Sequence, residues 1–175
     1  MLTLIKRCPQ FVDGYRAYCQ EAFDAHERFF IPTDPARIDG TWFLRTKDWY
    51  DRKETGQVAG QPTGFHYWAV DGDQFIGEFQ LRTQFAEQVL TGIGSVGYAV
   101  RVSKRGRGYG TALLQQGLKL AKAHGMEKVL LNIHADNAVS LHICEKLGGV
   151  RMDTIRVSDG ANESHAMHRY WILLS

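Results

Sequence analysis

Cysteine is scarce in this chain of 175 residues, and the three that occur form no recognisable set. Cys8, Cys19 and Cys144 are odd in number, widely spaced and without a CxxC pair. A disulfide framework or a zinc site is therefore not expected, and three reduced, packed thiols are the default interpretation. No other cluster of side chains has metal-ligand spacing, so no metal is expected either.

Long apolar segments are also missing. No run approaches the roughly 18 residues that a membrane-spanning helix needs, and the start MLTLIKRCPQ lacks the basic-then-apolar layout of a signal peptide. We therefore expect a cytoplasmic protein that does not bind membranes. The charge is nearly balanced, with 21 Lys+Arg against 19 Asp+Glu, which gives no global reason to bind nucleic acid or an anionic surface.

What is present is typical of a globular protein: 44% hydrophobic and 23% charged residues. No repeat, low-complexity tract or linker divides the chain, so residues 1–175 are predicted to form a single domain.

Hydrophobic periodicity predicts a strand, helices, three strands, a helix, a strand, a helix and a final pair of strands. The predicted strands are residues 3–7, 65–70, 74–81, 94–102, 128–134, 150–157 and 164–173, with a turn at 158–160. The predicted helices are residues 10–28, a segment around 42–52, a segment from the glycines at 106–110 to Gly125, and 137–147 with Asn137 as N-cap. This order indicates an α/β fold in which helices flank one mixed sheet.

The segment at 98–111, YAVRVSKRGRGYGT, is the most informative part of the chain. A predicted strand ends in a loop with Gly106, Gly108 and Gly110, and an amphipathic helix begins at once. Glycines allow a ligand to approach the backbone, and the first N–H groups of a helix favour an anion. Four basic residues lie within seven positions: Arg101, Lys104, Arg105 and Arg107. That much charge suits a pyrophosphate with a further phosphate better than a single phosphate.

Other anion-binding motifs fit this segment poorly. A P-loop needs GxxxxGK[ST], and no Lys-Ser or Lys-Thr follows these glycines. The spacing of the three glycines also fails the dinucleotide motif GxGxxG. Residues 92–97 match its letters, but a predicted strand follows them where a helix is needed. RNA-binding RGG tracts occur in disordered chain rather than at the start of a helix.

The sequence at 105–110 resembles the [QR]-x-x-G-x-[GA] loop that binds acyl-CoA in the GNAT N-acetyltransferase superfamily, at the same strand-to-helix junction. NAVS at 137–140 with EKLGG at 145–149 is similar to the second conserved segment of that superfamily. The resemblance runs from about residue 75 to the end. It implies the GNAT-like α/β fold, with a single central sheet that contains a splayed strand pair and helices on its faces.

The resemblance also implies where acetyl-CoA binds. Backbone amides of 105–111 would hold the pyrophosphate, and the strand at 98–102 would diverge from residues 130–134 to admit the pantetheine arm. An N–H of the first strand would stabilise the thioester oxyanion. The implied cofactor-binding residues are Tyr98, Ala99, Val100, Val102, Arg105, Gly106, Arg107, Gly108, Tyr109, Gly110, Thr111, Asn137 and Ser140.

Three residues are candidates for catalysis. Members of the superfamily often have a tyrosine on the last helix that protonates the departing thiolate, and Cys144 occupies the aligned position; a buried cysteine is more often an inert packing residue. An alkylamine with a pKa of about 10.4 is almost fully protonated at pH 7, so a proton acceptor assists attack. Glu78 is the first candidate, acting through water, unless it faces solvent on an edge strand or pairs with Arg82. His134 is the second, unless it is an ordinary turn residue.

The implied function is transfer of an acetyl group from acetyl-CoA to a primary amine of a small molecule or peptide, by direct attack in a ternary complex. Two alternatives stay open: a non-catalytic acyl-CoA-binding regulatory module of the same fold, and a nucleic-acid or nucleotide-binding protein that uses KRGRG. The acceptor-side elements, about 1–64, precede the acetyl-CoA-binding core, about 65–175, and carry no specific motif. Homodimers are common among similar proteins, but no interface motif is present. Aromatic residues would line an acceptor cleft or simply form a core: Phe29, Phe30, Trp42, Trp49, Tyr50 and Trp68.

Overall fold

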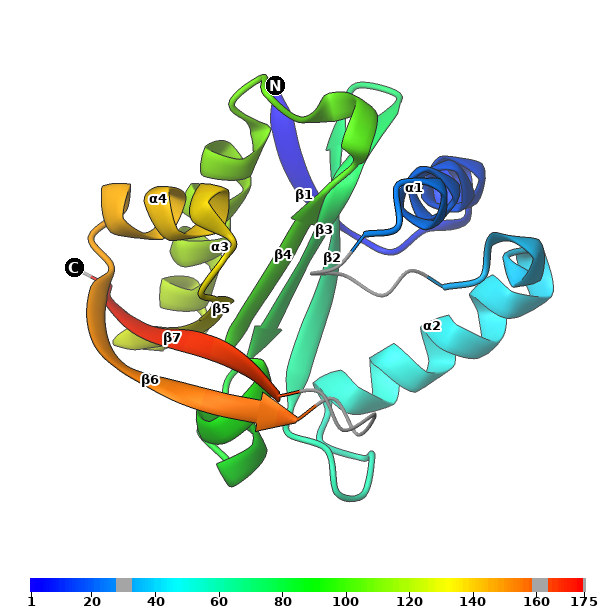
Figure 1. The fold of residues 1–175 in the computed structure, drawn as a ribbon. Coiled ribbons are helices and arrows are strands. Elements are labelled where there is room, and N and C mark those ends of the chain that lie inside the picture. Colours follow the sequence, from blue (N-terminus) through cyan, green and yellow to red (C-terminus); the bar gives the residue numbers. More distant parts are fainter. Residues whose placement is uncertain (28–32, 159–163, 175) are drawn as a thin grey trace.

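The fold is seen in a computed structural model that describes residues 1–27, 33–158 and 164–174 (Figure 1). Its strands are β1 (Leu2–Lys6), β2 (Gly64–Asp71), β3 (Gln74–Arg82), β4 (Val96–Val100), β5 (Lys128–His134), β6 (Val150–Ser158) and β7 (Ser164–Leu173). Its α-helices are α1 (Val12–Asp24), α2 (Gly40–Glu54), α3 (Tyr109–Ala123) and α4 (Ala138–Lys146). This order confirms the predicted α/β fold. Of the predicted turn at 158–160, Asp159 and Gly160 lie outside the described residues.

The strands form two hydrogen-bonded sheets, in the orders β1-β2-β3-β4 and β5-β7-β6, with antiparallel neighbours throughout. The sequence predicted one sheet with a splayed strand pair, and the splay is the point where the two sheets meet. β4 and β5 are the facing edges. They approach at Ser95 and Leu130 and then separate.

Two predicted boundaries were too wide. The strand expected at 94–102 is confined to β4, and Val102 begins a 3-10 turn, Val102–Lys104. The helix expected at 10–28 is shortened to α1 because Pro9 opens a separate 3-10 turn, Pro9–Phe11, and His26 has a φ of 47°, outside the helical range.

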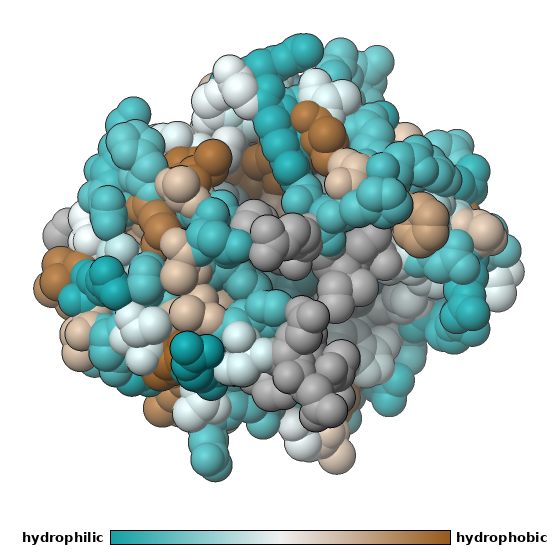
Figure 2. Space-filling model, viewed as in Figure 1, coloured by the Kyte–Doolittle hydropathy of each residue, from teal (hydrophilic) through white to brown (hydrophobic). Residues whose placement is uncertain are grey.

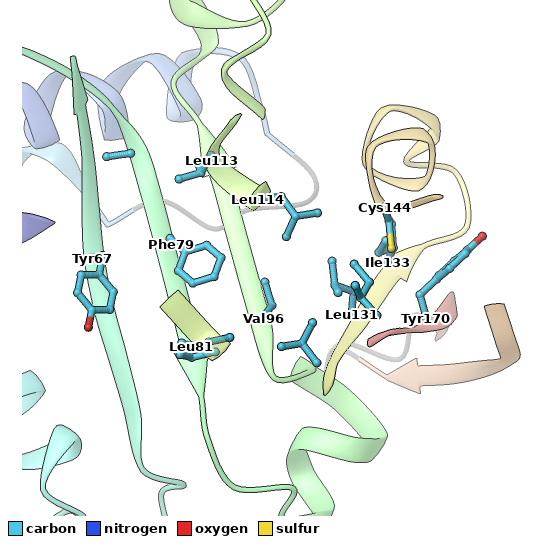
Figure 3. Close-up of a cluster of buried hydrophobic side chains, with 14 of the residues drawn as sticks. Tyr67, Phe79, Leu81, Val96, Leu113, Leu114, Leu131, Ile133, Cys144 and Tyr170 are labelled. Atoms are coloured by element: carbon cyan, nitrogen blue, oxygen red, sulfur yellow. The ribbon is translucent and has the colours of Figure 1, made fainter. Parts of the chain in front are cut away.

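Helices cover both faces of the first sheet (Figure 1). On one face, α1 and α2 pack against β2 and β3 through an aromatic cluster that includes Tyr15, Trp42 and Trp68. On the other face, Leu113 and Leu114 of α3 pack in a second cluster. This second cluster contains side chains from both sheets, among them Phe79 and Leu81 of β3, Val96 of β4, Leu131 and Ile133 of β5, and Tyr170 of β7 (Figure 3). Apolar packing therefore holds the two sheets together where their hydrogen bonding stops.

Two polar side chains fix the starts of helices α2 and α4. The Asp39 carboxylate accepts a hydrogen bond from the Trp42 amide at the start of α2, at 2.7 Å. Asn137 does the same for α4, accepting from the Ser140 amide at 3.1 Å, which confirms its predicted role as N-cap. At the other end of α4, Gly148 has a φ of 89°, the left-handed conformation that ends a helix.

The face seen in Figure 2 is mostly hydrophilic, and its hydrophobic residues gather over α4 and the adjoining ends of β6 and β7. The exposed apolar side chains of these elements are Val139, Val150, Met152 and Leu173.

The contact between α3 and β3 leaves no room for a side chain at Gly117. A Cβ built there would lie 2.0 Å from Cε2 of Phe79, which is fully buried. Gly117→Ala should therefore lower the free energy of unfolding by about 1–3 kcal/mol, the usual cost of overpacking a core. Urea unfolding of the purified variant measures the change.

Gly40→Ala is the matched control, because nothing lies within 4 Å of a Cβ at this first residue of α2. It should be neutral or stabilising by up to about 1 kcal/mol. Equal stability of the two variants would contradict the close approach of α3 to β3.

Candidate active site

A cleft opens where β4 and β5 separate. Ser95 and Leu130 join the two edges: the Ser95 amide donates to the Leu130 carbonyl at 2.8 Å, and the Leu130 amide donates to the Ser95 hydroxyl at 2.6 Å. The residues that follow in both strands line a cavity of about 340 Å³. The strands thus diverge from a common point, and the space between them is open to a ligand.

Three of the predicted cofactor-binding side chains meet in this cavity. Tyr98 on β4 lies with its hydroxyl 3.1 Å from the hydroxyl of Ser140 on α4, and Asn137 lies beside them as the helix cap. Burial raises the pKa of Tyr98 to about 12, so its phenol stays protonated at neutral pH. Ala99 lines the cavity as well, whereas Val100 does not.

The glycine loop lies beyond the end of β4. Gly106 and Gly108 have φ values of 73° and 81°, and a Cβ at either position would meet no atom within 4 Å. Within the described residues, the amides of 106–111 donate to no backbone carbonyl or side chain. The loop and the first turn of α3 therefore present free N–H groups over open space, as the sequence predicted for an anion site.

The predicted positive charge of the loop is partly neutralised. Arg101 pairs with Glu21 at 2.7 Å, and Arg105 pairs with Glu27. Both carboxylates come from α1 or the residues just after it, so the ion pairs tie the loop to that helix. Lys104 and Arg107 form no ion pair within the described part of the chain, which leaves the backbone N–H groups and two cations for a ligand.

Some predicted side chains point elsewhere. The Tyr109 hydroxyl donates to Asp71 in the β2–β3 turn at 2.8 Å, and the Val100 carbonyl accepts from the Arg105 side chain at 3.0 Å. Val102 lies in the turn after β4 and does not reach the cavity. Thr111 lies in the first turn of α3 and does not line the cavity.

Glu78 is buried at the wall of the cavity. It lies on β3 between β2 and β4, so it is on a central strand and does not face solvent as an edge residue. Its side chain is 5% exposed. One carboxylate oxygen lies 2.7 Å from Nε2 of His66, and the other accepts a hydrogen bond from the Tyr18 hydroxyl at 3.4 Å. Glu78 does not pair with Arg82, which bonds to Gln80 instead.

The family is decided by comparison with known proteins. The model of the acetyltransferase (GNAT) domain matches residues 14–150. The chain belongs to the GNAT acetyltransferase family. This confirms the resemblance that the two motifs indicated.

Relatives and solved structures agree with the GNAT assignment. The chain is 34% identical over 111 residues to the mycothiol acetyltransferase of Streptomyces scabiei (strain 87.22), covering 63% of this chain and 34% of that protein. It therefore spans about a third of that relative's length. The microcin self-immunity acetyltransferase MccE, solved with acetyl-CoA and AMP, has a TM-score of 0.75 at 11% identity, over 98% of this chain and 92% of that one. A chimera of the spermidine N-acetyltransferase SpeG from Vibrio cholerae has a TM-score of 0.67 at 16% identity, over 99% and 95%.

At the position where many GNAT proteins have a tyrosine, this chain has a cysteine that is buried in the core. Cys144 is fully buried on α4, does not line the cavity, and burial raises its pKa to about 12. A thiol with that pKa is a weak acid, which favours the interpretation of a packing residue. His134 does line the cavity, at the end of β5, with its ring 5.5 Å from that of His165.

Sequence reasoning missed three cavity or support residues in this GNAT domain. His66 holds Glu78 from β2, while Gln80 and Arg82 line the cavity beside it. Strand alternation was the available pattern, because residues 78, 80 and 82 of one strand share a face. Of the aromatic residues considered for an acceptor cleft, Trp42 and Trp68 are buried in the core, and Phe29 and Phe30 lie outside the described residues.

Two negative findings apply to the described ranges 1–27, 33–158 and 164–174. They contain no group of three or more His, Cys, Asp or Glu side chains that could hold a metal ion. They also contain no helix whose length and apolar character would let it cross a membrane.

The glycine loop can be tested by changing its charge alone. Gly108→Asp should weaken acetyl-CoA binding by about a hundredfold or more, equivalent to about 2.7 kcal/mol, because it adds a negative charge among the free amides. Gly108 is the N-cap of α3 with a left-handed φ of 81°, a conformation that Asp and Asn tolerate better than other side chains do. The fold should survive both changes.

Gly108→Asn has the same shape and backbone strain without the charge, so it should bind acetyl-CoA at least tenfold more tightly than Gly108→Asp. Calorimetric titration gives both affinities, and thermal unfolding checks the fold. Equal affinity for Asp, Asn and the original glycine would remove the loop from the cofactor site.

The packing interpretation of Cys144 predicts its reactivity. Burial raises the pKa of both Cys19 and Cys144 to about 12, so at pH 8 the thiolate fraction of each should be about a thousandfold below that of a free thiol with a pKa of about 8.5. Iodoacetamide should leave both unlabelled in the native protein and label them in urea, as read by peptide mass mapping. Fast native labelling of Cys144 would contradict its burial.

Proposed function

We propose that this GNAT domain transfers an acetyl group from acetyl-CoA to a primary amine, by direct attack in a ternary complex. The observation that carries the proposal is the buried carboxylate of Glu78 on the wall of the cavity beside β4, with the free amides of the glycine loop following the end of that strand. One cleft thus offers a site for the phosphates of a donor and a proton acceptor for an amine.

The chain's own groups fit acetyl-CoA, which would supply an activated acetyl thioester. The loop at 106–111 offers N–H groups to the pyrophosphate, with Lys104 and Arg107 as nearby cations. The cavity between β4 and β5 offers an extended slot for the pantetheine arm, with Asn137 and Ser140 at its side. Held on these groups, the thioester would lie against the middle of β4.

An N–H group of β4 is directed into the cleft. The Arg82 amide donates to the Ser95 carbonyl, and the Arg101 amide donates to the Ile76 carbonyl, so the odd-numbered residues 95–101 form the hydrogen-bonded pairs with β3. The amide of Tyr98, at an even position between them, points away from β3 toward β5. A donor at this place would stabilise negative charge on the thioester oxygen during attack.

Glu78 is held in a fixed position to accept the proton of the attacking amine, directly or through one water. Its neighbours His66 and Tyr18 each occupy one oxygen, which limits its rotation. As the nitrogen–carbon bond forms and the carbon–sulfur bond breaks, the amine proton passes to the carboxylate and CoA leaves as a thiolate. A thiol with a pKa of about 8.5 leaves without an acid, so a reactive group at Cys144 is not needed.

A second candidate function is that of a non-catalytic module that binds acyl-CoA. It is favoured by the thiol at the usual tyrosine position, which is buried and weakly acidic and so provides no ready acid for catalysis. Release of free CoA thiol on addition of an amine panel distinguishes the two functions. Acetyl-CoA binding without amine-dependent release would establish the non-catalytic module.

Removing the charge of Glu78 should affect turnover in a pH-dependent manner. Glu78→Gln should lower kcat by about a hundredfold at neutral pH, the typical contribution of a general base. The loss should shrink as the pH rises toward the amine pKa of about 10.4, because a growing fraction of the amine is then neutral without assistance. CoA release measured from pH 6.5 to 9.5 gives the profile.

Glu87→Gln is the matched control, since it neutralises an exposed carboxylate that does not line the cavity. Its pH profile should follow that of the unmodified protein. A loss in Glu78→Gln that is the same at every pH, or no loss, would limit Glu78 to a structural role.

A further inference from the structure

One face of β3 carries a row of three different polar groups. Side chains of a strand alternate between its two faces. One face of β3 therefore carries Glu78, Gln80 and Arg82, and the opposite face carries the apolar Phe79 and Leu81. All three line the cavity. A carboxylate, an amide and a guanidinium therefore succeed one another along its wall.

Arg82 is a cation without a counterion. Its Nη2 donates to the Gln80 side chain at 2.7 Å and its Nη1 to the Gly94 carbonyl at 3.4 Å, both neutral acceptors. Its Nε is buried and has no hydrogen-bond partner, and Arg82 forms no ion pair in the described part of the chain. A half-buried guanidinium with a buried, unused donor normally pairs with a carboxylate or phosphate.

A second cation lies close to Arg82. Lys53 of α2 lies in a small adjoining pocket that Arg82 also lines. Burial and repulsion from Arg82 both lower the pKa of Lys53, so the two cations destabilise each other. An anion at this place would relieve the repulsion.

A second unused group lies among the same cavity residues. Asn132 on β5 donates its amide N–H to the Gly92 carbonyl at 2.9 Å, but its Oδ1 is buried without a partner. Gly92 lines the cavity and Gly94 bonds to Arg82, so both groups lie near the segment that leads into β4. Arg82 and Asn132 thus both line the cavity with a polar atom that has no partner.

The pairing of β3 with β4 places Arg82 far from the glycine loop. Glu78 pairs with Ala99 in the ladder and Gln80 with Gly97, while the Arg82 amide bonds to Ser95 before β4 begins. The glycine loop follows the opposite end of β4. Arg82 therefore lies on the far side of Glu78 from the proposed phosphate site, where only the acceptor would reach it.

We propose that the acceptor is an amine that also carries an anionic group, and that Arg82 binds this group while the amine lies at Glu78. The inference rests on the proposed function, since it assigns Glu78 to the amine. Four residues of a strand span about 13 Å between Cα atoms. The long side chain of Arg82 shortens the gap, so the amine and the anion should be separated by several bonds rather than lie on one carbon.

A matched acceptor panel tests the inference. CoA release is measured with ω-amino carboxylic acids from glycine to 8-aminooctanoate, each against the n-alkylamine of the same carbon number. We expect a higher kcat/KM for the carboxylate of each longer pair, by about 10- to 100-fold and mainly through KM, the range of a charge-assisted hydrogen bond. The ω-aminoalkylphosphonates of the same lengths show whether the site prefers a carboxylate or a phosphate-type group.

Variants assign the preference to the residue. Arg82→Gln should reduce the ratio of kcat/KM for the carboxylate over the alkylamine to near one, Arg82→Lys should retain part of it, and Arg82→Glu should shift the preference to diamines. Arg45→Gln removes an exposed arginine of α2 that does not line the cavity and should leave the ratio unchanged. Thermal unfolding of each variant checks the fold.

The failures are distinguishable. Acetylation of amines by the unmodified protein with no preference for an anionic group would overturn this inference and leave the proposed function standing. A preference that persists at full size in folded Arg82→Gln would remove Arg82 from recognition. Absence of CoA release with every member of the panel would contradict the proposed function and the inference with it.

Discussion

The attachment of the segment that leads into β4 to the edge of β5 is the constraint on which the rest of the structure depends. Ser95, fully buried, forms three hydrogen bonds with the backbone of Leu130. Gly94, with a φ of 68°, permits this approach, because a Cβ there would lie 2.9 Å from the Leu130 carbonyl. Beyond this point, the strand edges have unpaired N–H and C=O groups facing the cavity. The core cluster that spans both sheets keeps them together, so the cleft exists without a ladder to close it.

Burial of Glu78 costs free energy, and residues from several elements around the first sheet offset this cost. An ionised carboxylate placed alone in a protein interior costs several kcal/mol. His66 from β2 and Tyr18 from α1 bond to it, and Arg7 follows β1 among the aromatic rings of α2 and β2. Burial lowers the pKa of Arg7, and several phenolic or carboxylate neighbours, Glu78 among them, act in the opposite direction and raise it. Helices α1 and α2 thus do more than cover the sheet, because they complete the surroundings of the carboxylate and of Arg7.

Most of the fold could be predicted from local patterns. The β2–β3 hairpin, the capped α4 and the glycine loop before α3 each follow from residues adjacent in sequence. The missed features depend on distant pairs. Glu21 and Glu27 neutralise arginines about 80 positions away, and nothing in the local sequence of either segment indicates the pairing. His66 lies in an apolar strand where a lone histidine has many roles, so its contact with Glu78 became evident only from the register of β2 and β3.

The two ends of the cleft differ in how they would recognise a ligand, and this difference explains which end the sequence revealed. The cofactor end would bind through backbone N–H groups, and such a site requires glycines at fixed spacing. A site of this kind can therefore be recognised in the sequence as a motif. The acceptor end would bind through side chains of one strand, at Glu78, Gln80 and Arg82. A strand imposes only alternation, which many buried and exposed strands share. Side-chain recognition also changes with a single substitution, so a fixed fold with a fixed donor site can serve different acceptors.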